Sequence, residues 1–424
     1  MSVSIIIIGG GWSGCAAALA ARQQKADVTL IERTDMLLGT GLVGGIMRNN
    51  GRFTATEELI AMGGGELFEL IDRNLIHRNI NFPGHRHASL YNVATIEPAV
   101  RQLLTERGVH ILLQSRITDV SMNGGCIRSL EGSSRKKPFT VAGDMFVDAT
   151  GTAGPTAMCT RHGNGCAMCI LRCPAFGGRV SVTGKCNIAE MAAQKPGQTG
   201  AMSGSCKLHK ESLSHDIRDR LNNTGMAVIA IPDEQNIKGK LEIKACQQYA
   251  LDDFEANVIL LDTGHAKLMT PYFPLELLRR IPGFENARFE DPYAGGVGNS
   301  VRFTAMAPRD DCLKVNGMEN LFCAGEKAGL FVGHTEAICT GTLAGYNAAR
   351  PDKQGLTIPD TLAIGDAISH VRQEMTEKNR LDRKYTFSGS VLFERMKEKD
   401  LYTTDITAIK KRVARTGLAN LFSR

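Results

Sequence analysis

Residues 4–14 read SIIIIGGGWSG and decide how the first part of this chain folds. Four consecutive isoleucines predict a buried strand, because β-branched side chains favour extended backbone. The glycines that follow match G-x-G-x-x-G, and the Ala-rich residues 12–25 predict a helix that starts at this turn. A second predicted strand, Val28–Ile31, leads into Glu32. The sequence therefore opens with a βαβ unit and predicts an α/β fold.

The three glycines and Glu32 form a dinucleotide-binding pattern in which each residue has a physical task. Gly9 permits a tight turn, Gly11 lets the backbone approach a pyrophosphate, and Gly14 allows close packing of helix on strand. The helix N-terminus would face the pyrophosphate, and Glu32 would accept a hydrogen bond from a ribose hydroxyl. A plain glycine turn is the alternative, but the strand-turn-helix order favours a nucleotide site. The pattern alone does not separate NAD from FAD.

The residues after this unit predict a doubly wound domain that carries a small antiparallel meander. Apolar residues recur at helical spacing between Glu57 and Ile76, and a further helix is predicted over 93–105. Turn signals separate the strands of the meander, and Arg135–Lys137 is predicted to be a hairpin tip. The predicted strands lie at 109–113, 117–120, 127–130 and 145–147.

The later elements predict a discontinuous organisation. A strand at 321–324 and a helix at 334–350 return the chain to its first domain, while strands at 226–231 and 257–261 fall in an insertion. Helices at 360–383 and 403–415 form a tail, with a turn at Ser388-Gly389. The predicted parts are a nucleotide-binding domain (1–154 plus 301–350), a cysteine-rich segment (155–200), an inserted α+β substrate domain (201–300) and a helical C-terminal region (351–424).

Composition and apolar patterning indicate in which compartment the protein is expected. The chain has 424 residues, 12 cysteines and a net charge of +6. The short apolar opening lacks a basic flank and runs into a glycine turn, so it is no secretion signal, and no apolar stretch is long enough to span a membrane. We therefore expect a cytoplasmic protein whose cysteines are reduced or bind metal. The tail carries 14 basic and 10 acidic residues, which is typical either of a solvated helix face or of an RNA contact.

Two later segments separate FAD from NAD. Residues 148–151 read DATG after the meander, and residues 320–326 read NLFCAGE, a strand that ends in Gly-Glu. A helix then opens at 333–336, GHTE, and continues to GTLAGYNAA at 341–349. This set resembles the glucose-inhibited-division and folate-dependent tRNA-uridine-methylating flavoproteins, and more broadly the glutathione-reductase-type FAD oxidoreductases. The resemblance covers roughly residues 3–50, 93–154 and 275–350.

The resemblance implies a Rossmann-like FAD-binding domain of the glutathione-reductase type and positions for the cofactor contacts. The counterpart of Gly325-Glu326 lies by the ribityl chain and pyrophosphate, and the helix that starts at 333–336 faces the flavin ring. His334 stands where the family has tyrosine. No second fingerprint follows a strand, so a separate NAD(P)H domain is not expected. The predicted cofactor contacts are Gly9, Gly11, Trp12, Ser13, Gly14, Glu32, Arg33, Gly39, Thr40, Ile117, Ala149, Thr150, Gly151, Gly325, Glu326, Gly333, His334 and Thr335.

Four cysteines follow soon after Gly151, and the resembled families are not expected to carry them. Cys159, Cys166, Cys169 and Cys173 have the spacing C-x6-C-x2-C-x3-C, with Pro174 directly after the last. The final part matches a ferredoxin run, so the spacing predicts a [4Fe-4S] cluster. Structural zinc, a purely structural cluster and no metal at all are the alternatives. Cys186 or Cys206 could replace Cys159 as the fourth ligand.

Four residues are candidates for chemistry. His334 and Glu336 lie at the helix start that faces the flavin, and His85 lies in a basic loop, residues 77–87, that could bind an anion or supply a proton. Arg302, like Arg309, precedes the last flavin strand and could hold a carboxylate or phosphate. A solvated loop at 77–87 and an ion pair of Arg309 with Asp310 or Asp311 are the alternatives.

Together these patterns predict an FAD- and [4Fe-4S]-dependent oxidoreductase. Hydride chemistry at flavin N5 would be coupled to one-electron transfer through the cluster. Its partners would be a small-molecule substrate and a ferredoxin-like one-electron carrier. A flavin-dependent enzyme that modifies uridine in tRNA or rRNA is the first alternative, and a non-catalytic, metal-stapled flavoprotein is the second.

Overall fold

The computed structural model describes most of the chain: residues 2–151, 175–193, 201–202, 207–236, 238–239, 241, 249–269, 273–290, 301–302, 304–351, 354–377, 381 and 383–424. A parallel five-stranded sheet forms its centre, in the order β19-β10-β1-β2-β6. Its strands come from both ends of the predicted nucleotide domain, namely β1 (Ser4–Ile8), β2 (Asp27–Ile31), β6 (His110–Leu112), β10 (Met145–Asp148) and β19 (Leu321–Cys323). The predicted βαβ opening and the return of the chain near residue 321 are confirmed.

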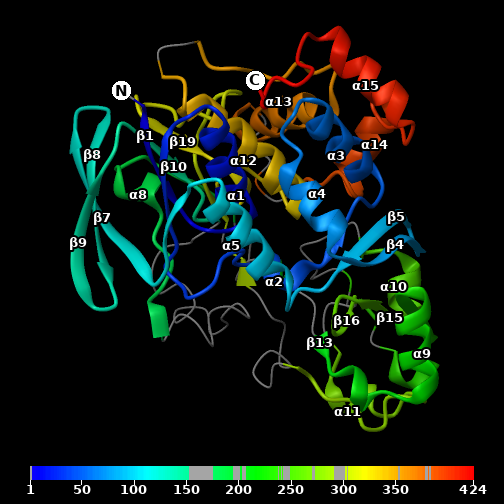
Figure 1. The fold of residues 1–424 in the computed structure, drawn as a ribbon. Coiled ribbons are helices and arrows are strands. Elements are labelled where there is room, and N and C mark those ends of the chain that lie inside the picture. Colours follow the sequence, from blue (N-terminus) through cyan, green and yellow to red (C-terminus); the bar gives the residue numbers. More distant parts are fainter. Residues whose placement is uncertain are drawn as a thin grey trace.

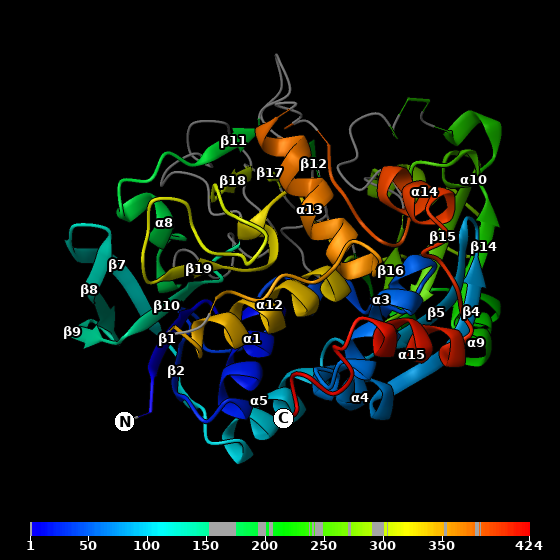
Figure 2. The same cartoon turned by 90° about the horizontal axis from the view of Figure 1, so that it is seen from above.

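Helices α1 (Trp12–Gln23) and α12 (His334–Ala348) lie side by side on one face of this sheet (Figures 1 and 2). Glycines bring their backbones together. A Cβ added to Gly341 would lie 2.2 Å from the Ser13 carbonyl oxygen, and one added to Gly345 would lie 2.1 Å from that of Ala17. The approach at Gly14 is closer still, because a Cβ added there would lie 1.9 Å from the Gly9 carbonyl oxygen. The strand, the turn and both helices therefore form one closely packed unit.

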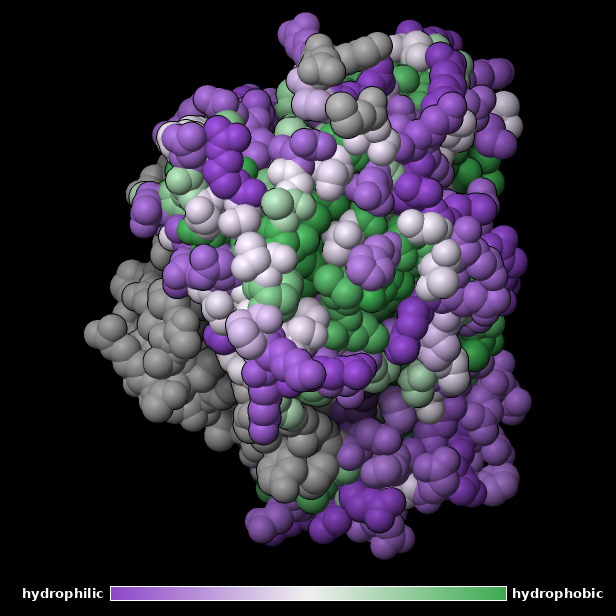
Figure 3. Space-filling model, turned by 60° about the vertical axis from the view of Figure 1, so that its left-hand side comes forward, coloured by the Kyte–Doolittle hydropathy of each residue, from purple (hydrophilic) through white to green (hydrophobic). Residues whose placement is uncertain are grey.

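The antiparallel meander lies beyond the sheet from these helices (Figure 2) and consists of β7 (Ser115–Asn123), β8 (Cys126–Ser134) and β9 (Lys137–Ala142). Arg135 and Lys136 turn the hairpin with φ of 49° and 68°, so the predicted tip is confirmed. Phe139 and Val141 pack against the main core. On the face that Figure 3 brings forward, polar residues cover most of the surface and apolar ones gather in its middle.

The segment after the first βα unit differs from its prediction. The helical stretch of 57–76 is two helices, α3 (Gly51–Ala61) and α4 (Glu66–Arg73), because Gly63-Gly64-Gly65 interrupts it. The predicted loop 77–87 is wrong as well, since its residues form a hairpin of β4 (Leu75–Phe82) and β5 (His85–Tyr91) around Pro83-Gly84. The short helix α2 (Gly41–Gly44) precedes β3 (Ile46–Met47), and β3 pairs with β5. Helix α5 (Ile96–Glu106) follows the hairpin.

The inserted region contains a separate antiparallel sheet, in the order β13-β16-β15-β14. Its strands and helices surround a hydrophobic cluster of their own, which includes Leu208, Leu260 and Phe284. Two short ladders, β11 with β18 and β12 with β17, join residues near 191–202 to residues near 301–306. The elements are α8 (Val182–Lys185), β11 (Met191–Ala193), β12 (Ala201–Met202), β13 (Lys207–Leu208), α9 (His215–Thr224), β14 (Met226–Ala230), α10 (Asp252–Ala256), β15 (Asn257–Asp262), β16 (Ala266–Leu268), α11 (Leu275–Leu278), β17 (Val301–Arg302) and β18 (Thr304–Met306).

The C-terminal region is helical, but its described residues form three helices where two were predicted: α13 (Ala363–Thr376), α14 (Ser390–Glu398) and α15 (Ile406–Arg415). Glu58 of α3, fully buried, ties α13 and α15 to the body of the protein. Its carboxylate accepts hydrogen bonds from the first amides of α13, Ala363 N at 3.0 Å and Ile364 N at 3.1 Å, and from Arg412 of α15 at 3.0 Å. Burial raises the pKa of Glu58 to about 7 despite these partners. Among the described helices, none is both long and apolar enough to cross a membrane.

We predict that Gly345→Ala lowers the free energy of unfolding by about 2 kcal/mol or more, because overpacking against backbone cannot be relieved by a rotamer change. Thermal unfolding followed by circular dichroism measures the effect. Gly178→Ala is the matched control, since a Cβ there has no heavy atom within 4 Å. Equal melting temperatures for the two variants would contradict the close approach of α1 and α12.

Candidate functional site

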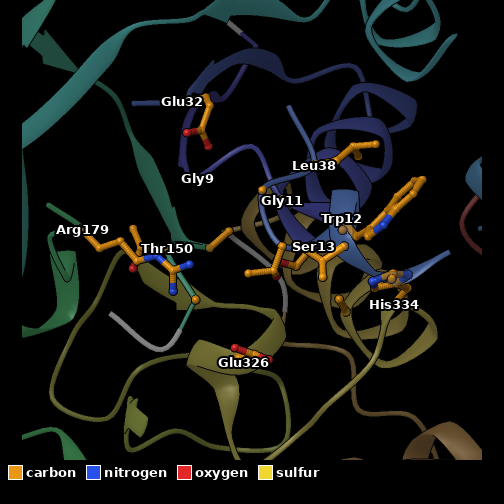
Figure 4. Close-up of a pocket in the computed structure, with 18 of the residues that line it drawn as sticks. Gly9, Gly11, Trp12, Ser13, Glu32, Leu38, Thr150, Arg179, Glu326 and His334 are labelled. Atoms are coloured by element: carbon orange, nitrogen blue, oxygen red, sulfur yellow. The ribbon is translucent and has the colours of Figure 1, made fainter. Parts of the chain in front are cut away.

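A long cavity opens where the parallel strands β1, β2 and β10 end (Figure 4). Ligands of open α/β sheets bind at this edge, because the loops that follow the strands leave a crevice there. The described residues that line the cavity come from these loops, from α2, from the inserted sheet and from the start of α12. They include Ile8–Gly9, Gly11–Ser13, Ile31–Thr34, Leu38–Gly41, Val43–Gly44, Ile46, Arg52, Ser115–Ile117, Ala149–Gly151, Arg179–Val180, Tyr249, Lys267, Met269, Glu326, Val332–His334 and Ala337.

The glycine turn is shaped to receive a pyrophosphate. Gly9 has φ of 103° and lies so close to the next strand that a Cβ would be 2.4 Å from the Ala149 carbonyl oxygen. Gly11 is the opposite case, since a Cβ there would meet nothing within 4 Å. The Gly11 carbonyl accepts the first helical bond, from Cys15 N at 3.0 Å, so the amides of the first turn of α1 face the open space. Open space in front of a helix N-terminus fits a phosphate group.

Glu32 is held ready at the end of β2. Its Oε2 accepts from Gly10 N at 2.8 Å and its Oε1 from Thr34 N at 2.9 Å, and the residue is 7% exposed. A carboxylate has about four acceptor positions, so two remain after these bonds. Because Glu32 lines the cavity, it can accept the hydroxyls of a ribose there. Turn and carboxylate together fit the pyrophosphate and ribose of FAD.

The structure gathers nearly all predicted cofactor contacts around this one cavity, and three of them lie behind its wall. Gly14 lies beneath the Gly9 carbonyl. Gly325 approaches the Ser13 side chain, and its amide donates to Thr340 Oγ1 at 2.9 Å. Thr335 is fully buried behind Gly333. These three residues shape the wall of the cavity and do not line it.

The candidates for chemistry are placed differently from one another. His334 lines the cavity. His85 does not line it. This residue is 2% exposed; its ring stacks on Phe82, with centroids 4.6 Å apart, and lies tilted against Tyr249, with centroids 4.8 Å apart. Arg302 belongs to β17, and its side chain lies outside the described residues, as do the four cysteines of the predicted cluster.

Glu336 also lies away from the cavity, in a buried ion pair with Arg52. Its oxygens are 3.2 Å from Arg52 Nε, and Oε1 accepts from Thr386 Oγ1 at 2.7 Å and from Phe387 N at 2.8 Å. Arg52 Nη2 donates to the carbonyl of Val332, the residue directly before Gly333, at 3.2 Å. The pair therefore holds the start of α12 in place, which is a positioning role.

Arg309 is buried, and its partners are structural. It donates to the Ala328 carbonyl at 2.8 Å, to the Ile368 carbonyl at 2.9 Å and to Asp311 at 3.3 Å. The alternative reading of Arg309 as an ion-pairing residue is confirmed. Burial lowers its pKa, and the nearby acidic groups act against that change.

Two lysines near the inner end of the cavity, where α2 meets the inserted sheet, were not predicted from the sequence. Lys267 Nζ donates to the carbonyls of Val43 at 2.6 Å and Gly44 at 2.7 Å, and Lys207 Nζ donates to that of Leu42 at 3.0 Å. The lysines are directly opposite on β13 and β16, so the inserted sheet binds the C-terminal carbonyls of α2. No motif surrounds either lysine, so the fold alone identifies them.

The described residues on both sides of the cysteine segment contact the cavity. Thr150 and Gly151 line it before the segment, and Arg179 and Val180 line it afterwards (Figure 4). Arg33 donates to the Gly177 carbonyl at 2.6 Å, and Arg116 Nε donates to that of Gly178 at 2.8 Å. Asp148 accepts from Thr183 N and Oγ1, both at 2.8 Å. The chain thus leaves the cavity at β10 and returns to it.

Cys186 lies in the returning stretch and is buried, and burial raises the pKa of its thiol to about 12. Within the described part of the chain, no group of three or more His, Cys, Asp or Glu side chains is arranged to hold a metal ion. The predicted cluster ligands Cys159, Cys166, Cys169 and Cys173 are not among these residues.

We predict that Glu32→Gln weakens FAD binding about tenfold, equivalent to about 1.4 kcal/mol. An amide nitrogen cannot accept a hydrogen bond, so the variant must give up a backbone contact or a ribose contact. Fluorescence titration of the apoprotein with FAD measures the dissociation constant. Glu131→Gln, an exposed position on the middle strand of the meander, is the control. An unchanged dissociation constant for FAD in Glu32→Gln would show that Glu32 does not bind the ribose.

Comparisons with known proteins agree with this geometry. Residues 4–159 match the family model described as FAD dependent oxidoreductase, and residues 253–355 match that of Glucose inhibited division protein A. The form II crystal structure of Aquifex aeolicus GidA is similar at 15% identity and a TM-score of 0.70, over 98% of this chain and 74% of that one. The form I structure gives 14% and 0.63, over 98% and 79%. The chain is an FAD-dependent oxidoreductase with a fold like that of glucose inhibited division protein A.

Proposed function

We propose that this oxidoreductase carries a [4Fe-4S] cluster on Cys159, Cys166, Cys169 and Cys173 in addition to FAD. The observation that carries the proposal is the path of the chain. Residues on both sides of the cysteine segment line the FAD cavity, at Thr150–Gly151 and Arg179–Val180. The spacing of the cysteines supports the same reading, since it ends in a ferredoxin run. A one-electron centre near a two-electron cofactor suits exchange between a substrate and a one-electron carrier protein.

The chain's own residues divide the cavity into two functional ends. Glu32 and the glycine turn bind the nucleotide, and Arg33 and Arg116 fix the returning segment beside it. The other end is lined by Ile46, Tyr249, Met269, Lys267 and His334, which come from β3, the insertion and α12. We place a small-molecule substrate at this end. Bound FAD would supply hydride chemistry there, while apolar side chains exclude water and His334 accepts a proton from the substrate.

A second candidate function is modification of uridine in RNA, favoured by the family match over 253–355 and by the basic face of α15. Lys410, Lys411 and Arg415 are exposed on this helix. Phosphate contacts dominate protein–RNA affinity and make it depend on salt. The cysteine quartet is not expected in the resembled RNA-modifying families, so its presence in this chain favours the first function.

For the proposed cluster we predict about four iron and four sulfide per chain after anaerobic purification. Cys169→Ser should keep FAD and the melting temperature but lose the reduced-cluster EPR signal and electron transfer to a one-electron acceptor. Cys126→Ser, whose thiol lies on the meander, is the matched control and should retain both. Iron-free protein would refute the cluster, and full turnover of iron-free Cys169→Ser would make it structural.

For the RNA alternative the expected result is a gel shift of tRNA that weakens steeply with salt. Replacing Lys410, Lys411 and Arg415 by alanine should then weaken binding at least tenfold at low salt, because three phosphate contacts are removed. Ser423→Ala, on the exposed C-terminal end, is the control. Undetectable tRNA binding by the wild type at low salt would remove this candidate.

A further inference from the structure

Tyr91 and His334 meet at the inner end of the cavity, although 243 positions separate them in sequence. The Tyr91 hydroxyl is 3.1 Å from His334 Nδ1 and also 3.1 Å from the Gly41 carbonyl oxygen. Tyr91 is fully buried at the end of β5, so bulk water does not replace either contact. Burial also raises the pKa of the Tyr91 phenol, which therefore keeps its proton.

The single hydroxyl proton of Tyr91 decides which group donates in each of its two contacts. A phenol has one proton, and a carbonyl oxygen can only accept. If the Tyr91 proton lay on the His334 side, two oxygens with lone pairs would face each other at 3.1 Å inside the protein. With the proton directed at Gly41, the phenol oxygen accepts Nδ1–H from the imidazole, and both contacts are hydrogen bonds.

We propose that Tyr91 is a positioning residue that fixes the tautomer of His334, so that the neutral imidazole carries its proton on Nδ1 and its lone pair on Nε2. The second nitrogen of a histidine is commonly set in this way by the partner of the first. His334 is then a hydrogen-bond acceptor at Nε2, and it takes a proton there.

Gly44 makes room for the ring in this orientation. A Cβ at position 44 would lie 1.7 Å from His334 Cε1 and 2.4 Å from Nε2. Trp12 packs against both rings, and its ring centroid is 6.1 Å from that of Tyr91 and 6.1 Å from that of His334. Lys267 Nζ donates to the Gly44 carbonyl at 2.7 Å, so the backbone beside the His334 ring is bound to the inserted sheet.

This inference rests on the proposed function and deepens it. An acceptor at Nε2 suits a substrate that gives up a proton as well as a hydride, namely one with a hydroxyl or an N–H group on the carbon that is oxidised. The hydride would pass to FAD, the proton to Nε2, and a carbonyl or imine would remain. A ring protonated at Nε2 would instead donate a hydrogen bond and could not begin by accepting that proton.

The test is the tautomer itself, read by long-range proton–nitrogen NMR on 15N-histidine-labelled protein as purified, at a pH where the ring is neutral. The chain has 10 histidines, and His334→Asn identifies the resonances of interest. We expect Nδ1 of His334 in the range of a protonated ring nitrogen and Nε2 in that of an unprotonated one. Neutral His334 protonated at Nε2 in the wild type would overturn the proposal, whether or not any variant folds.

Tyr91→Phe keeps the ring and removes the hydroxyl, so the His334 tautomer should shift toward Nε2–H. Tyr346→Phe, a buried change at the far end of α12, is the control and should leave the His334 spectrum unchanged. An unchanged tautomer in Tyr91→Phe also overturns the proposal. Since the spectrum does not require turnover, a protein that binds no FAD but has His334 protonated on Nδ1 would refute the proposed function and retain this inference.

Discussion

The backbone contact of α1 with α12 is the constraint on which the rest of the structure depends. Gly341 and Gly345 let α12 touch the carbonyls of Ser13 and Ala17, and Gly14 brings α1 equally close to the glycine turn. Because both helices start at the cavity, the contact sets the distance between the pyrophosphate turn and His334. A larger residue at any of these glycines would move one helix start relative to the other, and a ligand that spans them would no longer fit both ends.

The sequence allowed prediction of features that depend on local physics. The strand, the glycine turn and Glu32 follow from a pattern of fewer than thirty residues, and they occupy their expected positions. Gly63–Gly65 separates α3 from α4, although the apolar spacing on both sides of these glycines favours one continuous helix. Hairpin β4/β5 was not predicted, because the polar, partly exposed residues of β4 do not alternate clearly and the pairing of β5 with β3 depends on tertiary contacts.

The inner end of the cavity could not be predicted, because its residues meet only through the fold. Lys267 comes from the insertion, Tyr91 from a hairpin and Arg52 from α3, and none belongs to a motif. Glu336, by contrast, was predicted from the sequence but has a structural role. Its place at a helix start suggested chemistry, yet Arg52, Thr386 and Phe387 occupy its carboxylate. The same contacts attach the segment before α14 to the start of α12, so the C-terminal region supports the wall of the site.

The bonds from Arg33 and Arg116 to Gly177 and Gly178 have a thermodynamic consequence. These arginines line the nucleotide end of the cavity and also hold the stretch that follows the cysteines. Two ligands that favour the same arrangement strengthen each other's binding by an equal factor. A nucleotide in the cavity would therefore stabilise the returning stretch through these arginines, and an ordered returning stretch would favour binding of the nucleotide by the same factor.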